Sequence, residues 1–402
     1  MTSTPTSRRE HALAVSAATV RKDRQTLIAL SHSLHADPET AMREYRSAAK
    51  IARIAEDAGF TVTCEVADLP TAFVATYGSG DLVIGLCAEY DALPGIGHAC
   101  GHNVNGAAST GAALALASVA DLVGITVQLI GTPAEEDIGG KALLLEAGVF
   151  DDVAAAFMVH AAGEDSVGGS SLAIGAWDVV YTGKPAHAAL APWEGINALD
   201  AITLARTAVG LLRQQLPPGS MVHDIVFGAG DAVNVIPDTA RARYELRART
   251  TQDLEHTRRR VRACLEAAAL ATGADLELAP HGADFADLRQ DDFLTDAYVR
   301  VATALGREPV NRRNELMAST DMGNVSHLLP ALHPTIGYDT QGAQHHTAAF
   351  ARYGTSPQAD RAVLDAATAL AHTGVELATD PTQRERCLRL LSDRQGSAVE
   401  RE

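Results

Sequence analysis

Apolar side chains recur at helical spacing over the first part of the chain. Between residues 10 and 58 they fall three and four positions apart, as at Leu27, Leu34 and Ile51, which predicts amphipathic helices. Gly59 follows the last of these positions and would end the second helix, because glycine readily takes the left-handed conformation found after a helix. We therefore expect the chain to begin with helices.

After residue 59, short apolar runs alternate with helical segments. The run 82–89, LVIGLCAE, is apolar at nearly every position, which is typical of a strand buried on both faces. This alternation predicts a layered α/β domain around a largely parallel sheet, in which functional residues collect beyond the carboxyl ends of strands. The expected strands are 60–65, 82–89, 125–132 and 153–160, and the expected helices are 104–120 and 139–147.

The pattern changes near residue 173, where the order strand, helix, strand, strand, helix, strand begins. This βαββαβ order is that of a ferredoxin-like unit of about a hundred residues. Helical spacing returns after Phe285, and the apolar run LHPTIGY predicts one more buried strand. A chain of 402 residues is also longer than one core usually allows. We predict a first domain of residues 1–174 and 286–402, with a second domain of residues 175–285 inserted into it.

Composition narrows the classes of partner. The formal net charge is −17, from 33 basic and 50 acidic residues with no basic cluster, so we expect no nucleic-acid partner. The chain has no run of about eighteen apolar residues and no signal-peptide-like N-terminus, so we expect no membrane association. Its five scattered cysteines do not resemble a disulfide framework. A reducing, cytoplasmic location is therefore expected.

The segment AEYDALPGIGHACGH, residues 88–102, places Asp91, Cys100 and His102 directly after an apolar run. Thiolate and imidazole are ligands of transition metals. Cys100 and His102 are two positions apart, so they cannot share one helix face and must lie on a loop or turn. The helix expected next would put Cys100 near a helix N-terminus, where the dipole lowers the pKa of a thiol. A buried, small apolar residue is the other interpretation of Cys100.

A second cluster, GTPAEED, follows the expected strand 125–132. In an extended chain Glu135 and Glu136 would point in opposite directions, so one could bind metal while the other handles protons. In a metal-assisted hydrolase the unbound glutamate takes a proton from the activated water and delivers it to the leaving amine. A solvated acidic loop is the alternative.

Histidines supply further candidates. His160 would end an expected strand, where it is either a ligand or a hydrogen-bonded core residue. In AQHHTAAF, either His345 or His346 could be a ligand, and both could be surface residues. His187, in GKPAHAA, belongs to the inserted domain and would approach a site from another direction.

Taken in order, these motifs resemble the aminoacylase and carboxypeptidase type of dinuclear metallopeptidase family. More narrowly, the chain is similar to the amidohydrolase branch that includes p-aminobenzoyl-glutamate hydrolase subunits, indole-acetyl-amino-acid hydrolases and certain dipeptidases. The resemblance extends from about Leu27 to Ala378, and seven motifs in one order are specific although each alone is modest. The motifs are AEYDALPGIGHACGHN, GTPAEED, FMVH, GKPAHAA with EGINALDA, NVIPD, STDMGNVSH and HHTAAF.

The resemblance implies a site with two divalent metal ions. On the matching positions the thiolate of Cys100 would bridge the metals, Glu135 would be the general acid/base, and Asp91 would orient a ligand. Imidazole and thiolate suit zinc, whereas members of this branch are often linked with manganese, so both metals stay open. The remaining ligands implied are His102, Glu136, His160 and His346, the last because the family ligand stands four residues before an aromatic, here Phe350.

The inserted domain resembles the family's lid and dimerisation domain. By this resemblance His187 and Asn234 would approach the substrate and stabilise a tetrahedral oxyanion, in some members across the dimer interface. A homodimer through this domain is implied. Arg247, in YELRA, could instead bind a substrate carboxylate or simply be solvated. Asn103 stands where many relatives carry aspartate, and this form resembles the p-aminobenzoyl-glutamate hydrolase and dipeptidase side of the branch.

We therefore expect a metal-dependent amidohydrolase or peptidase that cleaves the amide bond of an N-acyl amino acid or small dipeptide with an activated water and a glutamate base. Two alternatives stay open. Cys100 activated by His102 would make a cysteine-nucleophile hydrolase, but the glutamates and the other histidines would then have no role. A non-catalytic, small-molecule-binding protein of the same fold is the second.

Overall fold

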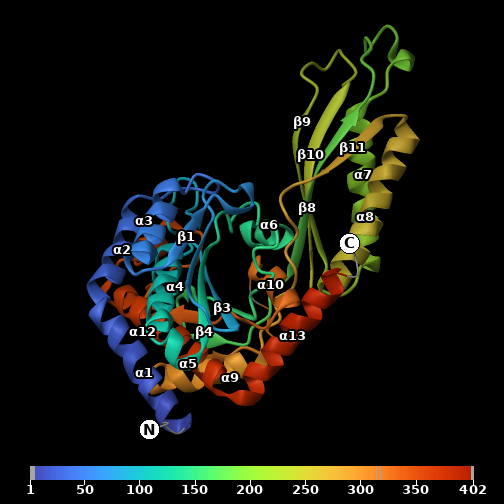
Figure 1. Ribbon diagram of the computed structural model, residues 1–402. Coiled ribbons are helices and arrows are strands. Elements are labelled where there is room, and N and C mark those ends of the chain that lie inside the picture. The colour runs from blue at the N-terminus through green and yellow to red at the C-terminus, as the bar shows by residue number, and fades with distance from the viewer. Residues whose placement is uncertain (1–4, 314, 317, 400–402) are drawn as a thin grey trace. The chain divides into compact units, whose positions relative to one another are not determined.

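A computed structural model describes residues 5–399 of the protein, apart from 314 and 317 (Figure 1). The chain divides into two compact units. Unit 1 consists of Met1–Ser170, Leu288–Glu315 and Asp321–Glu402, and unit 2 consists of Ser171–Asp287 and Leu316–Thr320. Unit 1 is thus assembled from segments that are distant in sequence, and each unit has a hydrophobic core of its own.

Unit 1 is built around a six-stranded sheet. Its strands are, in spatial order, β1 (Thr61–Cys64), β2 (Phe73–Gly78), β4 (Ile125–Gly131), β3 (Leu82–Ala88), β5 (Ala155–Phe157) and β13 (Ala331–Leu332). The last four of these pair in parallel, whereas β1 and β2 form an antiparallel edge. The prediction of a layered α/β fold around a largely parallel sheet is confirmed.

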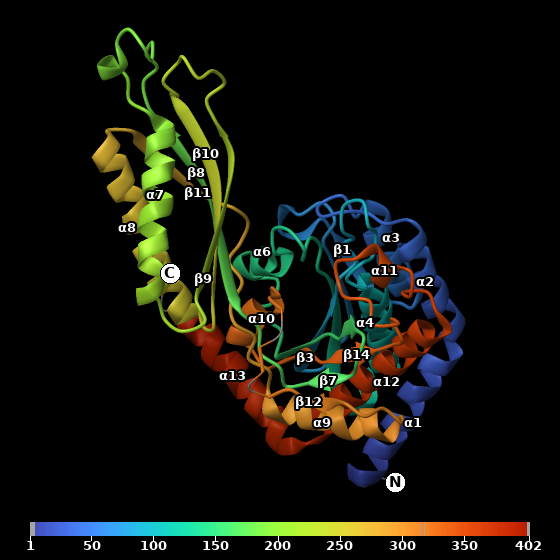
Figure 2. The same cartoon turned by 180° about the vertical axis from the view of Figure 1, so that it is seen from behind.

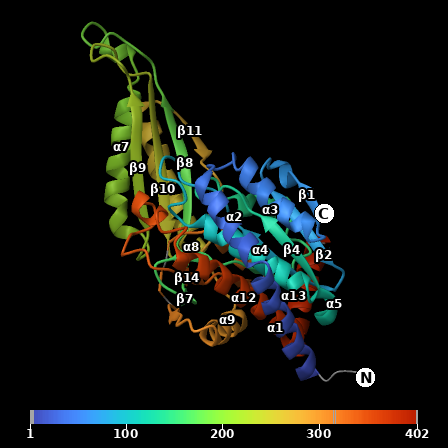
Figure 3. The same cartoon turned by 90° about the vertical axis from the view of Figure 1, so that its left-hand side faces the viewer.

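Helices cover both faces of this sheet. On one face, a layer of long helices lies side by side (Figure 3), made of α1 (Pro5–Lys22), α2 (Arg24–Ala36), α3 (Tyr45–Asp57), α4 (His102–Ala117) and α12 (Pro357–Thr379). The other face packs against α6 (Gly140–Glu146) and α10 (Met322–Leu328). The remaining helices of unit 1 are α5 (Ala120–Val123), α9 (Asp292–Ala304), α11 (Ala348–Ala351), α13 (Pro381–Val399) and the short 3-10 helix Val66–Asp68.

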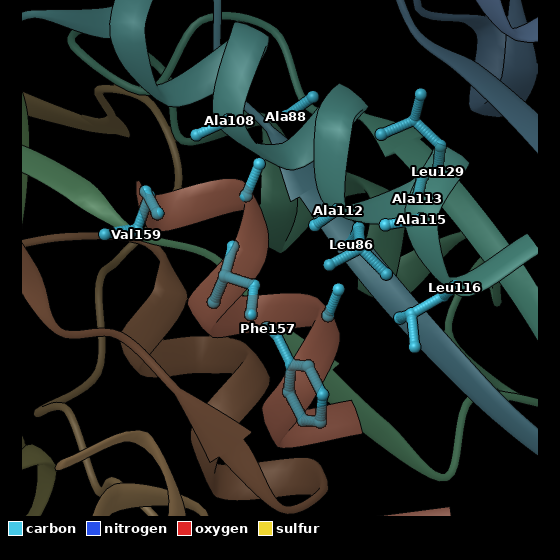
Figure 4. Close-up of a cluster of buried hydrophobic side chains, with 14 of the residues drawn as sticks. Leu86, Ala88, Ala108, Ala112, Ala113, Ala115, Leu116, Leu129, Phe157 and Val159 are labelled. Atoms are coloured by element: carbon cyan, nitrogen blue, oxygen red, sulfur yellow. The ribbon is translucent and has the colours of Figure 1, made fainter. Parts of the chain in front are cut away.

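The central strand β3 contributes side chains to the two hydrophobic clusters of unit 1, one on each face of the sheet. Leu86 packs toward α4, whereas Cys87 belongs to the cluster formed with α6 and α10. Figure 4 shows part of the larger core, where Leu86 lies with Phe157 of β5 and Leu116 of α4. Every residue of α4 from His102 to Leu116 is buried. Because packing holds α4 on all sides, its first residue has a defined position.

A second, smaller sheet changes the interpretation of His160. Its strands are β12 (Val310–Asn311), β7 (Ser166–Val167), β14 (Thr335–Gly337) and β6 (His160–Ala162), and Figure 2 shows three of them together. The prediction that His160 ends a strand 153–160 is wrong, because that strand stops at Phe157 and His160 begins β6. The neighbouring segment contains Pro334, which has no amide hydrogen with which to continue a ladder.

Unit 2 is a four-stranded antiparallel sheet with two helices on one face (Figures 1 and 2). Its strands are, in spatial order, β11 (Asp275–Pro280), β8 (Ala173–Thr182), β10 (Thr239–Ala248) and β9 (Met221–Ala229). The helices are α7 (Ala198–Leu212) and α8 (Thr251–Thr272), and two short 3-10 helices are Pro192–Glu194 and Arg213–Gln215. The side chains of Asn197 and Thr250 cap α7 and α8. The predicted ferredoxin-like order βαββαβ is confirmed.

Candidate metal centre

The loop after β3 brings Cys100 to His160. Gly101 has a φ of 79°, and a Cβ there would lie 2.5 Å from the Cβ of Ala161. This turn therefore needs glycine between the cysteine and the first residue of α4. As a result, the Sγ of Cys100 lies 3.7 Å from the Nε2 of His160.

His102 is fully buried, and Asp91 orients its ring. The Nδ1 of His102 donates to both the Oδ1 and the backbone oxygen of Asp91, at 2.9 Å each. Asp91 Oδ2 also accepts the backbone N–H of Glu136 at 3.0 Å. Among the described residues, the Nε2 of His102 has no hydrogen-bond partner, and neither does the buried Oε1 of Glu136. Buried polar atoms left unpaired beside one another fit a metal ion.

Glu135 and Glu136 converge, so the prediction that they point in opposite directions is wrong. The Oε2 of Glu135 and the Oε1 of Glu136 each lie 4.0 Å from the Nε2 of His102. The alternation of an extended strand does not apply here, because Ala134 has a left-handed φ of 58° and residues 135–138 form a turn. Both carboxylates can therefore serve one site.

Of the adjacent histidines, His346 reaches the thiol. A ring nitrogen of His346, the Sγ of Cys100 and a carboxylate oxygen of Glu136 lie within 4.8 Å of one another, and His346 Nε2 is 3.3 Å from Glu136 Oε2. His345 is turned elsewhere, since its Nε2 donates to the backbone oxygen of Ala161 at 2.9 Å. The two side chains therefore have different environments.

The residues brought together form a donor set suited to transition metals. Cys100 belongs to two groups of possible ligands, one with His102 and His160 and the other with Glu136 and His346. In each group the ligand atoms lie within 4.8 Å of one another. Because thiolate sulfur can contact two cations at once, and imidazole and carboxylate surround it, the side chains fit a pair of divalent ions.

Burial governs the protonation of this cluster. Desolvation raises the pKa of the Cys100 thiol well above its ordinary value, and the charges of Glu136 and Glu135 add to the effect, whereas nearby His102 opposes it. The prediction of a lowered thiol pKa at this position is therefore wrong, because burial disfavours the charged thiolate. Desolvation also lowers the pKa of His160 to about 3, which leaves its imidazole in the neutral form that binds metals.

A group of buried charged side chains next to this cluster was not predicted from the sequence. The Nζ of Lys141 lies 2.6 Å from Glu89 Oε1 and 2.6 Å from Asp321 Oδ1, and all three side chains are fully buried. The ring of His333 also packs near that of His160, with centroids 5.8 Å apart. The available signals were weak: Glu89 stands two residues before Asp91, and Lys141 begins the apolar run KALLLE.

His187 and Asn234 lie together in unit 2. His187 forms an antiparallel bridge with Val235, and the backbone N–H of Ala188 donates to the backbone oxygen of Asn234 at 3.0 Å. The side chains of His187 and Asn234 are exposed, and the Nδ1 of His187 accepts the backbone N–H of Ala189 at 3.2 Å. The Nε2 of His187 is thus the ring atom left to meet a ligand.

Two other singled-out residues have partners within their own units. Arg247 Nε donates to Glu245 Oε1 at 2.7 Å, and both side chains are about one-third exposed. Asn103 Nδ2 donates to Ser31 Oγ at 2.9 Å and to the backbone oxygen of Gly354 at 2.8 Å. Asn103 therefore ties α4 to neighbouring segments.

Comparisons with known proteins agree with this architecture. Residues 173–273 match the family model M20_dimer, described as a peptidase dimerisation domain. Xaa-Arg dipeptidase of Mus musculus is 36% identical over 378 residues, which are 90% of this chain and 88% of that protein. One of the p-aminobenzoyl-glutamate hydrolase polypeptides of Escherichia coli is 35% identical over 281 residues, covering 64% of this chain and 58% of that polypeptide.

A solved structure extends the similarity to metal binding. A Bacillus subtilis protein, described as a dinuclear metal binding peptidase from the M20 family, superposes with a TM-score of 0.67 at 25% identity, covering 89% of this chain and 98% of that one. The fold, the cluster and these relatives define a hydrolase acting on peptide or amide bonds. The chain belongs to the M20 peptidase family, a dinuclear metal-binding family, and the resemblance found in its motifs is confirmed.

Proposed function

We propose that this protein hydrolyses small dipeptides, or N-acyl amino acids of similar size, with two divalent ions of zinc or manganese. One observation carries the proposal: Cys100 lies at the junction of two histidine-containing ligand groups of unit 1, one of which includes buried His102 and the other exposed His346. The similarity to Xaa-Arg dipeptidase over nearly the whole chain supports a dipeptide substrate, and the similarity to p-aminobenzoyl-glutamate hydrolase supports an acylated amino acid.

In the proposed site the thiolate of Cys100 would help to hold both metal ions. When bound, the ions supply Lewis-acid polarisation of the amide carbonyl, an activated water and the positive charge that favours a thiolate. Asp91 keeps the Nε2 of His102 directed at the cluster, because both of its hydrogen bonds hold the Nδ1 side of the ring. The ligands we propose are Cys100, His102, Glu136, His160 and His346.

Glu135 is the proposed general base and acid. Desolvation raises the pKa of Glu135 well above the ordinary value, and the charges of nearby carboxylates raise it further. Glu135 can therefore hold the water's proton until the amine leaves. Glu136 differs: although burial opposes it, the hydrogen bond with His346 helps to lower the pKa of Glu136 to about 2. Two adjacent carboxylates whose pKa values are driven apart suit one acid/base and one ligand.

We assign oxyanion stabilisation to His187 and Asn234 of unit 2. Their exposure, their adjacency and the free Nε2 of His187 support this role. The match to a peptidase dimerisation domain supports a homodimer through unit 2, and exposed Ile225 and Phe227 on the edge strand β9 offer a pairing surface. We accordingly propose residues 1–174 and 286–402 as the catalytic domain and residues 175–285 as the lid and dimerisation domain.

Other expectations about the protein's surroundings stay predictions. These are the cytoplasmic location and the lack of nucleic-acid and membrane partners. Of the helices formed by the described residues, none combines the length and the apolar character needed to cross a membrane.

The test is a substrate panel with purified, metal-replete protein. The panel contains Xaa-Arg and other dipeptides, acetylated amino acids, p-aminobenzoyl-glutamate and indole-acetyl-aspartate. We expect hydrolysis of at least one dipeptide or acyl-amino-acid class, lost on chelation and regained with zinc or manganese. A lack of chelator-sensitive hydrolysis across the panel would contradict the proposal.

A further inference from the structure

Three buried carboxylates lie together beside the metal cluster, and we call the space between them the three-carboxylate pocket. Oxygens of Glu89, Glu135 and Asp321 lie within 4.8 Å of one another. Glu89 and Asp321 are fully buried, and Glu135 is 6% exposed. Like charges at this distance, removed from water, repel strongly unless a cation compensates them. The pocket therefore has the composition of a cation site.

The ammonium of Lys141 is that cation. Its Nζ donates to Glu89 Oε1 and to Asp321 Oδ1, each at 2.6 Å, and the side chain is fully buried. A lysine is almost never buried to this degree unless it is paired. The carboxylates of Glu89 and Asp321 thus both bind Lys141. The third carboxylate, that of Glu135, has its Oε2 4.0 Å from His102 Nε2.

The backbone fixes where this ammonium can be. The backbone N–H of Lys141 donates to Asp321 Oδ2 at 2.8 Å, so one carboxylate binds both ends of the residue. A Cβ on Gly140 would lie 1.9 Å from the backbone oxygen of Pro133, which shows how closely the start of α6 approaches the loop that carries Glu135. Lys141 and Glu135 therefore belong to backbone segments that lie in close contact.

The pocket is also linked to a proposed metal ligand. Glu89 Oε2 accepts a hydrogen bond from Asn105 Nδ2 at 2.9 Å and lies 3.4 Å from His102 Nε2. The carboxylate of Glu89 therefore lies next to both the ammonium of Lys141 and the imidazole of His102. Lys141 is thus linked to the metal cluster through its ion pair with Glu89. It is linked to the proposed acid/base, Glu135, through the pocket that the three carboxylates share.

We propose that Lys141 is a positioning residue whose ammonium occupies the three-carboxylate pocket in place of a further metal ion and keeps Glu135 directed at the metal pair. It acts through Glu89 and Asp321 and touches neither substrate nor metal. The inference rests on the proposed function for the role of Glu135, whereas the occupancy of the pocket can be measured without a substrate.

The first experiment compares Lys141→Met and Lys141→Ala with a matched control, Lys50→Met. Lys50 is a half-buried lysine of α3 that pairs with Asp37 at 3.2 Å. For Lys141→Met we expect a kcat about 100-fold lower, with KM within about threefold of wild type, because general acid/base catalysis contributes on this scale. Lys50→Met should keep wild-type kinetics. A folded Lys141→Met variant with wild-type kcat would overturn the proposal.

The second experiment refills the pocket of Lys141→Ala. Methylammonium chloride should raise its kcat at least about tenfold in a saturable manner, and should change neither wild type nor Lys50→Met. Without amine but with excess manganese, elemental analysis should find about one more metal ion per chain in Lys141→Ala than in wild type. Equal metal content together with no response to amine would overturn the proposal.

A third variant covers the case in which neither Lys141 variant folds. Asp321→Asn keeps an oxygen for the backbone N–H of Lys141 but removes one of the three charges. We expect kcat to fall about tenfold with unchanged metal content, and wild-type kcat would overturn the inference. If the wild-type protein itself hydrolyses nothing, the proposed function fails. The metal content of Lys141→Ala still shows whether the Lys141 ammonium stands in place of a further metal ion in the pocket.

Discussion

The metal cluster of unit 1 and the His187–Asn234 pair of unit 2 are built in opposite ways. Around the cluster, His102, Glu89 and Asp321 are fully buried and ion-paired or hydrogen-bonded before any ligand arrives. His187 and Asn234 are exposed, and they meet each other mainly through backbone contacts. The first set is therefore positioned by buried side-chain contacts, whereas the second set is positioned by its backbone and presents its side chains to solvent.

This difference predicts which property each substitution changes. Changes in the buried cluster should alter metal binding or the reacting groups, because each side chain there is positioned by several others. Changes at the exposed pair should alter turnover while metal content and folding stay the same. The following substitutions test that contrast.

Glu135→Gln should have the largest effect. The amide cannot take the water's proton, so we expect kcat to fall by about 10³-fold, while about two metal ions per chain are retained. Steady-state kinetics and elemental analysis check both numbers. Asp137→Asn, at an exposed acidic residue of the same loop, is the control and should behave as wild type. Near-normal turnover of Glu135→Gln would remove Glu135 from its proposed role.

Asp91→Ala should weaken metal binding. It removes the carboxylate that holds the Nδ1 of His102 and the backbone N–H of Glu136. Losing such a partner typically lowers metal affinity by about 10- to 100-fold. A chelator competition titration measures the affinity, and raised metal concentrations should recover turnover. Unchanged affinity would mean that the ring of His102 is held without Asp91.

His187→Ala should lower kcat by about 100-fold, the usual effect of losing one oxyanion donor. Because His187 is exposed, the thermal midpoint and the metal content should match wild type. His256→Ala, at a half-buried histidine of α8 in unit 2, is the control. A variant that loses metal ions together with activity would contradict the division between the two regions.

Arg247→Ala should have the smallest effect. Its guanidinium already pairs with Glu245 in a partly exposed position, and such pairs contribute little. We expect KM and kcat within about threefold of wild type for a dipeptide substrate. A KM raised more than about tenfold would instead show that Arg247 binds the substrate carboxylate.

Local patterns in the sequence were enough to predict much of the fold. The βαββαβ order of unit 2 follows from strands and helices long enough to show their periods. Strands β7 (Ser166–Val167) and β12 (Val310–Asn311) of the small sheet were missed because they are too short to show any period, whereas β14 (Thr335–Gly337) lies within the run LHPTIGY, where a strand was predicted. Strand β2 (Phe73–Gly78) was also missed. It pairs antiparallel with both β1 and β4, so this edge of the main sheet is antiparallel.

The site shows the same limit. Sequence motifs were enough to predict Cys100, His102 and the two glutamates as site residues, because each lies within a few residues of another candidate. The ion pairs of Lys141 join residues 52 and 180 positions apart, and a pattern of hydrophobic and polar residues assigns a lysine to the surface. Likewise, the left-handed φ of Ala134, which turns Glu135 and Glu136 to one side, has no sequence signal such as glycine.

Metal content measured alongside hydrolysis distinguishes a metal-dependent reaction from one that uses a cysteine nucleophile. We expect about two zinc or manganese ions per chain, loss of hydrolysis in proportion to their removal by a chelator, and recovery in proportion to their return. Cys100→Ser should bind fewer ions and lose activity with them. Metal-free protein that still hydrolyses its substrate, and that is inactivated by alkylation of Cys100, would contradict the account and identify a cysteine nucleophile.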